Sequence, residues 1–198
     1  MKHLFPLAIV SLTLAACVDT TGLSAETSKP VHPDTNTNAV VTVAEFADFQ
    51  CPACKAAHSL VVQPLIAQYG KQIRYEYHQF PLSSIHRFAM DAAEASECAA
   101  DQGKFWEFVD TAFEKQEQLS AAALDAWGAE LGLDTELYER CRASHIKRDM
   151  ILAEYADGQT AGVTGTPTFF VNGRKVESTV TAISEAINTA LSTAGKNL

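Results

Sequence analysis

Two cysteines separated by two residues lie at a predicted strand-to-helix junction, and this arrangement constrains the fold more than any other feature of the chain. Residues 40–49 are rich in β-branched and aromatic side chains and are expected to form a buried strand that ends just before Cys51. Residues 55–70 follow Cys54 and are expected to form a helix, and residues 73–80 predict a second strand. Together these segments predict a β-α-β unit with a right-handed crossover.

The remainder of the chain adds helices and then completes the sheet. The stretch 83–162 shows no strand pattern and is expected to contain four or five helices as a compact subdomain. Residues 166–178 predict a hairpin, because Asn172-Gly173 tolerates the positive φ angles of a type I′ turn. An amphipathic helix follows. The chain is therefore expected to have an α/β fold of order β-α-β, helical block, β-β-α.

The start of the chain has the pattern of a bacterial export signal. After a short basic start, residues 4–16 are apolar but too few to span a bilayer as a mature helix. They end in Leu-Ala-Ala-Cys17, which resembles the bacterial lipobox, in which the cysteine is lipidated. We expect a signal peptide over residues 1–16 and a lipid anchor at Cys17. A plain secretory signal is the alternative, and which membrane holds the anchor stays open.

A polar segment separates this signal from the predicted domain. Residues 17–38 are rich in Thr, Ser, Asn, Asp and Pro and show no apolar period. Such a segment has too little apolar surface to offset the entropy of ordering. We therefore expect a flexible tether over 17–38 and a folded domain over 39–198.

The chain contains five cysteines: Cys17, Cys51, Cys54, Cys98 and Cys141. An odd number in an exported protein requires an explanation, and lipidation of Cys17 leaves four. Export would place the domain in an oxidising compartment, where disulfides persist. A disulfide between Cys98 and Cys141 is our hypothesis, and it would stabilise the domain by ~4 kcal/mol through closure of a loop of about 44 residues. Two buried free thiols are the alternative.

The Cys51-Pro-Ala-Cys54 sequence is compatible with three kinds of site. A zinc site needs about four ligands, and Cys51, Cys54 and His58 supply three. A structural disulfide would close too short a loop to constrain the unfolded chain. A redox pair explains more, because the N–H groups and dipole of a helix N-terminus stabilise the thiolate that attacks disulfides. We expect Cys51 to be the exposed nucleophile, with Cys54 as the resolving thiol and Pro52 in the first helical turn.

Three motifs are typical of one family: "EFADFQCPACK", "AAEASECAADQGKFWEFVDTAFEKQ" and "GVTGTPTFFVNG". With them, residues 39–194 resemble the DsbA-like thiol–disulfide oxidoreductases, in the branch of exported or lipid-anchored bacterial proteins. The resemblance implies a thioredoxin fold with an inserted helical subdomain. It implies no cofactor and no metal.

The resemblance also implies roles for particular residues. Cys51 and Cys54 match the redox pair, and Thr166-Pro167 matches the loop, with a cis proline, that faces it. Glu45 matches a buried acid that takes the proton of Cys54; a solvated residue at the sheet edge is the alternative. The family's strongly oxidising members carry Pro-His between the cysteines, whereas this chain has Pro52-Ala53. Because alanine cannot help to stabilise a thiolate, the direction of electron flow stays open.

The other histidines near these motifs receive weaker interpretations. His58 is expected to be a solvated helix residue, although it could favour a thiolate electrostatically. His86 is expected to cap or pack, although the family often carries a histidine at this place.

These features predict an enzyme that introduces disulfides into exported proteins in the bacterial periplasm. Its expected partners are exported proteins with thiols or disulfides and a membrane redox partner. A reductase or isomerase fed by a membrane electron donor is one alternative, and a metal-handling or docking module on the same fold is another. The formal net charge of −9 and the absence of a basic stripe exclude a nucleic-acid-binding protein.

Overall fold

The computed structural model of the chain describes residues 18–195. The expected signal peptide and the expected lipidation site Cys17 lie outside the described residues. Within them, no helix is both long enough and apolar enough to cross a bilayer.

Four strands form one mixed sheet in the order β2-β1-β3-β4. The first two strands, β1 (Val41–Ala47) and β2 (Ile73–Gln79), are parallel. The strand β3 (Thr168–Val171) is antiparallel to β1 and to β4 (Arg174–Val176). Between β3 and β4, the φ angles of the Asn-Gly turn are 47° and 75°, which agrees with a type I′ turn.

The strands β1 and β2 are joined by one continuous helical segment, which begins with α1 (Pro52–Ala57). A π-helical turn, η1 (His58–Val62), precedes α2 (Gln63–Tyr69), and the 3-10 turn η2 (Gly70–Gln72) ends the segment. The π-helical turn lies just before Pro64, where a proline lacks the N–H and crowds the carbonyl of the preceding turn.

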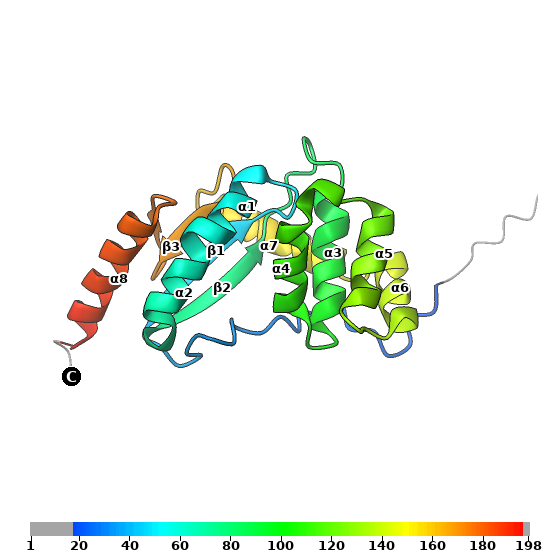
Figure 1. Ribbon diagram of the computed structural model, residues 1–198, viewed down its shortest axis with the longest axis horizontal. Coiled ribbons are helices and arrows are strands. Elements are labelled where there is room, and N and C mark those ends of the chain that lie inside the picture. Colours follow the sequence, from blue (N-terminus) through cyan, green and yellow to red (C-terminus); the bar gives the residue numbers. More distant parts are fainter. Residues whose placement is uncertain (1–17, 196–198) are drawn as a thin grey trace, which may run out of the picture.

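The helical subdomain contains α3 (Ala89–Ala100), α4 (Phe105–Glu114), α5 (Ala121–Glu130) and α6 (Thr135–Ser144), with a 3-10 turn η3 (Gln116–Gln118) between α4 and α5. These helices lie together beside the sheet, as Figure 1 shows. A disulfide joins Cys98 on α3 to Cys141 on α6, with the two Cα atoms 5.9 Å apart. The predicted α/β fold with a helical insertion is confirmed.

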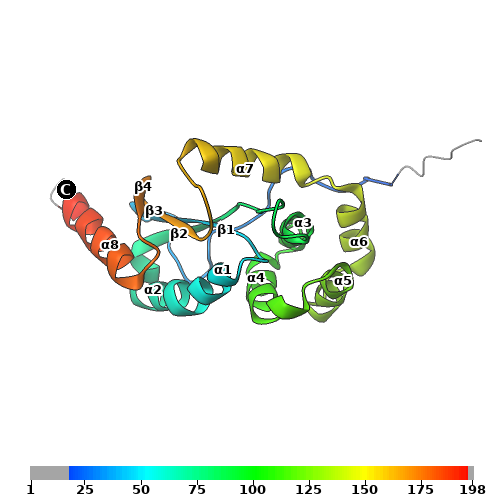
Figure 2. The ribbon, with the colours of Figure 1, turned by 90° about the horizontal axis from the view of Figure 1, so that it is seen from above.

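Two helices complete the layers on the faces of the sheet. The helix α7 (Arg148–Thr160) covers one face, whereas α1, α2 and the last helix α8 (Val180–Gly195) lie on the other (Figure 2). Strand alternation directs Phe46 and Phe170 toward α7, where they form a small cluster with Phe80. The residues that alternate with Phe46 along β1 therefore face α1 and the main core.

The structure differs from the expectation of a flexible tether between residues 17 and 38. The part that it describes, from residue 18 onward, runs along the helical subdomain and the sheet (Figure 1). Lys29 forms ion pairs with Glu97 at 3.2 Å and with Glu154 at 2.8 Å. The side chain of Glu97 is fully buried, and a buried charge is costly unless it is paired. Composition alone did not show that the helices would offer buried charges as anchors.

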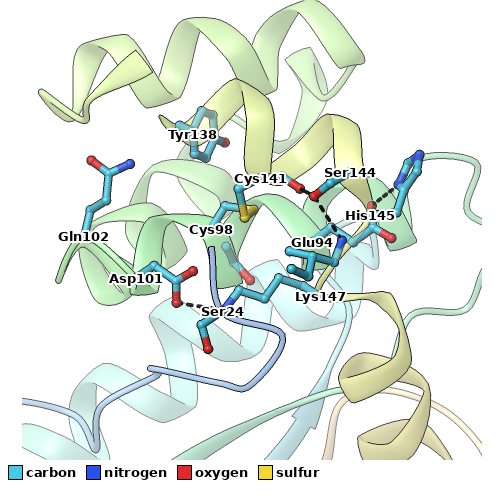
Figure 3. Close-up of a disulfide and its surroundings, with 12 residues drawn as sticks. Ser24, Glu94, Cys98, Asp101, Gln102, Tyr138, Cys141, Ser144, His145 and Lys147 are labelled. Carbon is cyan, nitrogen blue, oxygen red and sulfur yellow. Dashed lines mark hydrogen bonds and ion pairs between the residues drawn. A yellow bond between two sulfur atoms is a disulfide. The ribbon is translucent and has the colours of Figure 1, made fainter. Parts of the chain in front are cut away.

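A second anchor lies beside the disulfide, as Figure 3 shows. The buried ammonium of Lys147 donates to the carbonyl oxygen of Glu26 at 2.6 Å and to Asp101 at 2.7 Å. Further along, the main-chain N–H groups of His32 and Asn36 donate to carbonyl oxygens of β2. Because β2 is an edge strand, this segment covers backbone groups that would otherwise be open to pairing with another chain.

Candidate redox site

The two cysteines lie where β1 leads into α1. Cys51 is the N-cap residue of α1, with an extended backbone at φ −76° and ψ 119°, and Pro52 and Ala53 occupy the exposed first turn. Cys54 lies one turn further, fully buried against the main core. Both cysteines are free thiols. The backbone N–H groups of Ala53 and Cys54 in this first turn therefore favour a negative charge on the Cys51 sulfur.

The third part of the site comes from a distant segment. The bond between Thr166 and Pro167 is cis, and the Cys51 thiol donates to the carbonyl oxygen of Thr166 at 3.4 Å. The hydroxyl of Thr166 is buried and, among residues 18–195, has no hydrogen-bond partner. It is thus available to donate to a thiolate at Cys51.

The surroundings of Cys51 favour its charged form. Its pKa is lowered to about 5, first by a hydrogen bond from the Cys54 thiol and then by Thr166 and the N–H groups of Cys54 and Ala53. Burial opposes this effect. At neutral pH the reduced pair therefore holds Cys51 as a thiolate, the form that takes part in thiol–disulfide exchange.

The expectation of an exposed nucleophile requires a correction. Cys51 is only 7% exposed, because the Thr166 loop and the side chain of Gln116 lie against its turn. Cys54 is still the deeper of the two thiols, at 0% exposure. Its pKa is raised far above the ordinary range by burial, by the hydrogen bond to Cys51 and by the charge of Glu45. The two thiols thus differ strongly in acidity although both are largely covered.

Glu45 lies on the face of β1 that the main core covers. It is 2% exposed, so the alternative of a solvated residue at the sheet edge is wrong. One carboxyl oxygen accepts a hydrogen bond from the Tyr75 hydroxyl, and the other, Oε1, is buried without a partner among the described residues. Burial raises the pKa of Glu45 to about 7, although the Tyr75 hydrogen bond opposes the shift. Glu45 can therefore hold or release a proton near neutral pH.

Sequence reasoning missed Asp48, which connects the cysteine turn to the loop after β2. Its buried carboxylate accepts from the N–H groups of Gln50 at 2.7 Å and Leu82 at 2.9 Å. Nδ1 of His86 lies 2.7 Å from the same carboxylate. His86, which was expected to cap or pack, therefore contacts Asp48 specifically. An acid at the end of an apolar strand was the only signal, and two of its partners, Leu82 and His86, are more than 30 residues away.

His58 was expected to be a solvated helix residue, but the structure largely buries its side chain. Its side chain is 13% exposed, and Nε2 lies 2.9 Å from a carboxylate oxygen of Asp110 on α4. Within residues 18–195, no three His, Cys, Asp or Glu side chains gather in a group that could hold a metal ion.

Comparison with known proteins assigns the chain to a family. The family model described as Thioredoxin matches residues 35–189. The chain belongs to the thioredoxin family. Its fold is that of the DsbA-like thiol–disulfide oxidoreductases, in which a helical subdomain interrupts the thioredoxin fold.

Two solved structures resemble the chain over most of its length. A thioredoxin-like oxidoreductase from Silicibacter pomeroyi DSS-3 is 29% identical, with a TM-score of 0.68 over 85% of this chain and 93% of the other. Oxidised BdbD from Bacillus subtilis is 24% identical, with a TM-score of 0.73 over 83% of this chain and 94% of the other, and shows the shared fold.

Curated relatives of this thioredoxin-family chain are much longer proteins. The Na(+)/H(+) antiporter NhaA 3 of Salinispora tropica is 37% identical over 172 residues, which cover 83% of this chain and 26% of the antiporter. The chain thus matches about a quarter of the length of this relative.

Proposed function

We propose that the chain is a thiol–disulfide oxidoreductase that introduces disulfides into exported proteins through Cys51 and Cys54. The observation that carries this proposal is the contrast within the pair: the Cys51 thiol has a pKa of about 5, whereas burial raises the pKa of the Cys54 thiol. A sulfur that is stable as a thiolate is a good leaving group, and a pair whose reduced form is stabilised is oxidising.

The reaction proceeds in two exchanges, starting from the Cys51–Cys54 disulfide. A substrate thiolate attacks Cys51, so a bond between the substrate and Cys51 forms and the Cys51–Cys54 bond breaks. The released Cys54 sulfur takes a proton, for which Glu45 is the buried source. A second substrate thiolate then attacks the substrate sulfur and forms the substrate disulfide. Cys51 leaves as a thiolate, so the substrate has lost two electrons and the pair has gained them.

The direction of electron flow is tested by the equilibrium of the pair with glutathione. We expect a potential nearer to about −120 mV, as in strong oxidants, than to about −270 mV, as in thioredoxin. The reason is the stabilised Cys51 thiolate, although exposed Ala53 contributes no polar group to it. Redox buffers of known ratio, followed by mass spectrometry after thiol alkylation, provide the measurement. A potential near that of thioredoxin would instead favour the reductase alternative.

The proposed place of action is the periplasmic side of a bacterial membrane. Cys17 would carry the lipid after removal of residues 1–16, with residues 39–198 as the folded domain. A membrane redox partner would reoxidise the pair, and exported proteins with thiols would be the substrates.

Fractionation of bacterial cells tests this anchoring. The wild-type chain is expected in the membrane fraction, and a Cys17→Ser variant is expected in the soluble periplasmic fraction, because an acyl chain binds bilayers through its buried CH₂ groups. A wild-type chain found only in the soluble fraction would remove the lipid anchor from the proposal.

A further inference from the structure

A side chain of the helical subdomain reaches the turn that carries Cys51. Gln116 belongs to η3, the short turn between α4 and α5, and is largely buried. Its side-chain amide nitrogen, Nε2, donates to the carbonyl oxygen of Phe49 at 2.8 Å and to the carbonyl oxygen of Cys51 at 3.0 Å. The two hydrogens of one amide group thus satisfy two buried carbonyls that flank Gln50.

The Cys51 carbonyl has a special place in this turn. It also accepts the first hydrogen bonds of the helix, from the N–H groups of Cys54 at 3.0 Å and Lys55 at 3.2 Å. The orientation of this carbonyl determines how the peptide groups of the first turn lie, and the N–H groups of Ala53 and Cys54 are those that favour the Cys51 thiolate. Gln116 therefore fixes the position of the Cys51 carbonyl, which accepts the first hydrogen bonds of the helix.

The turn η3 is itself held against α1 by a contact at the surface. The Lys55 ammonium donates to the carboxylate of Glu117 at 2.6 Å and to the main-chain oxygen of Glu114 at 3.3 Å. Exposed ion pairs contribute little to stability, whereas loss of a buried hydrogen bond leaves an unsatisfied group. The contact at the surface thus helps to align η3, and the buried amide of Gln116 makes the stronger connection.

We infer that Gln116 is a positioning residue of the redox pair, through which the helical subdomain favours the Cys51 thiolate. This inference deepens the proposed function and rests on it in taking Cys51 as the reacting thiol. Gln116 does not touch the sulfur; it acts through the Cys51 carbonyl. Without its amide, the buried Phe49 carbonyl loses its side-chain donor and the Cys51 carbonyl keeps only the N–H groups of its own helix. The first helical turn then no longer has a fixed orientation toward the sulfur.

The test replaces the amide while keeping the volume of the side chain. Gln116→Met removes both donors, and Gln118→Met is the matched control, because Gln118 is an exposed residue of the same turn. The readouts are the pKa of Cys51, from thiolate absorbance during a pH titration, and the equilibrium constant with glutathione. For Gln116→Met we expect the acid dissociation constant of the Cys51 thiol to fall about tenfold, because the loss of one buried hydrogen bond costs about that much free energy. The equilibrium constant for oxidation of glutathione by the pair is expected to fall by a similar factor. Gln118→Met is expected to match the wild type.

A merely structural role would give a different result. Gln116→Met would then unfold at lower denaturant concentration but keep the wild-type titration and equilibrium, and this outcome would overturn the inference. If Gln116→Met does not fold, Gln116→Asn provides the same readouts, because its shorter side chain keeps an amide that cannot reach both carbonyls. Failure of the proposed function is seen separately, as a wild-type pair that does not oxidise a dithiol peptide.

Discussion

Replacing Cys51 with serine is expected to reduce the oxidation of a dithiol peptide to the rate measured without protein. A serine hydroxyl cannot form the disulfide that accepts the two electrons, and Cys51 is the thiol whose pKa is lowered, to about 5. The measurement is the loss of free thiols from a reduced peptide during incubation with oxidised protein. The wild-type domain is expected to oxidise one peptide dithiol per molecule.

Cys54→Ser is the matched variant for this experiment, because it removes the other sulfur from the same turn. In this variant the Cys51 thiolate can still attack the disulfide of an oxidised peptide, which breaks the peptide disulfide and forms a mixed disulfide between Cys51 and one peptide sulfur. Because Cys54 is absent and cannot release Cys51, this mixed disulfide is expected to accumulate when the variant is incubated with the oxidised peptide. Non-reducing electrophoresis and intact mass detect that species. If instead Cys51→Ser accumulated the mixed disulfide and Cys54→Ser did not, the assigned roles of the two cysteines would be reversed.

Replacing Glu45 with glutamine is expected to change how the stability of the reduced domain depends on pH. The pKa of Glu45 is raised from 4.5 to about 7 in the folded state, so the folded protein binds more protons than the unfolded chain between these values. Stability contributed by this group therefore falls as the pH rises from about 4.5 to about 7, by about 3 kcal/mol in all. Glutamine does not titrate, and the variant should be more stable than the wild type above pH 7.

Urea unfolding of the reduced proteins at about pH 5 and pH 8 provides the measurement. The difference between Glu45→Gln and the wild type is expected to be small at the lower pH and to approach about 3 kcal/mol at the higher pH. Tyr75→Phe is a useful second variant, because the Tyr75 hydroxyl lowers the pKa of Glu45 and its loss should move the transition to higher pH. A stability difference that does not change with pH would show that Glu45 is not the titrating group.

Hydrophobic patterns near the cysteine pair were sufficient to predict most of the sheet. The structure begins β2 at Ile73, as predicted, and ends it within one residue of the expected Phe80. These elements are local in sequence, and their patterns follow from alternation of buried and exposed side chains. The difference in acidity between the two cysteine thiols could also be expected from local sequence. A strand followed by a helix places the first cysteine at a helix N-terminus, where a negative charge is stabilised.

Other parts of the site depend on contacts between distant residues. Gln116 meets the Cys51 turn across 65 residues, and the Asp48 carboxylate meets Leu82 and His86. No spacing or periodicity marks such partners, because a hydrogen bond between distant segments depends on how whole helices pack. The segment from residue 18 to residue 38 shows the same difficulty, since its anchors are the buried charges of Glu97 on α3 and of Lys147 just before α7.

The amino-acid sequence by itself determined the order of strands and helices, the place of the cysteine pair and the candidates Glu45, Thr166 and Pro167. Only the tertiary structure decided that Cys51 is covered, that Glu45 is held by Tyr75 and that the helical subdomain contributes Gln116. The physical reason is that secondary structure follows from local patterns, whereas burial, and with it the pKa of each group, depends on every segment that packs around it.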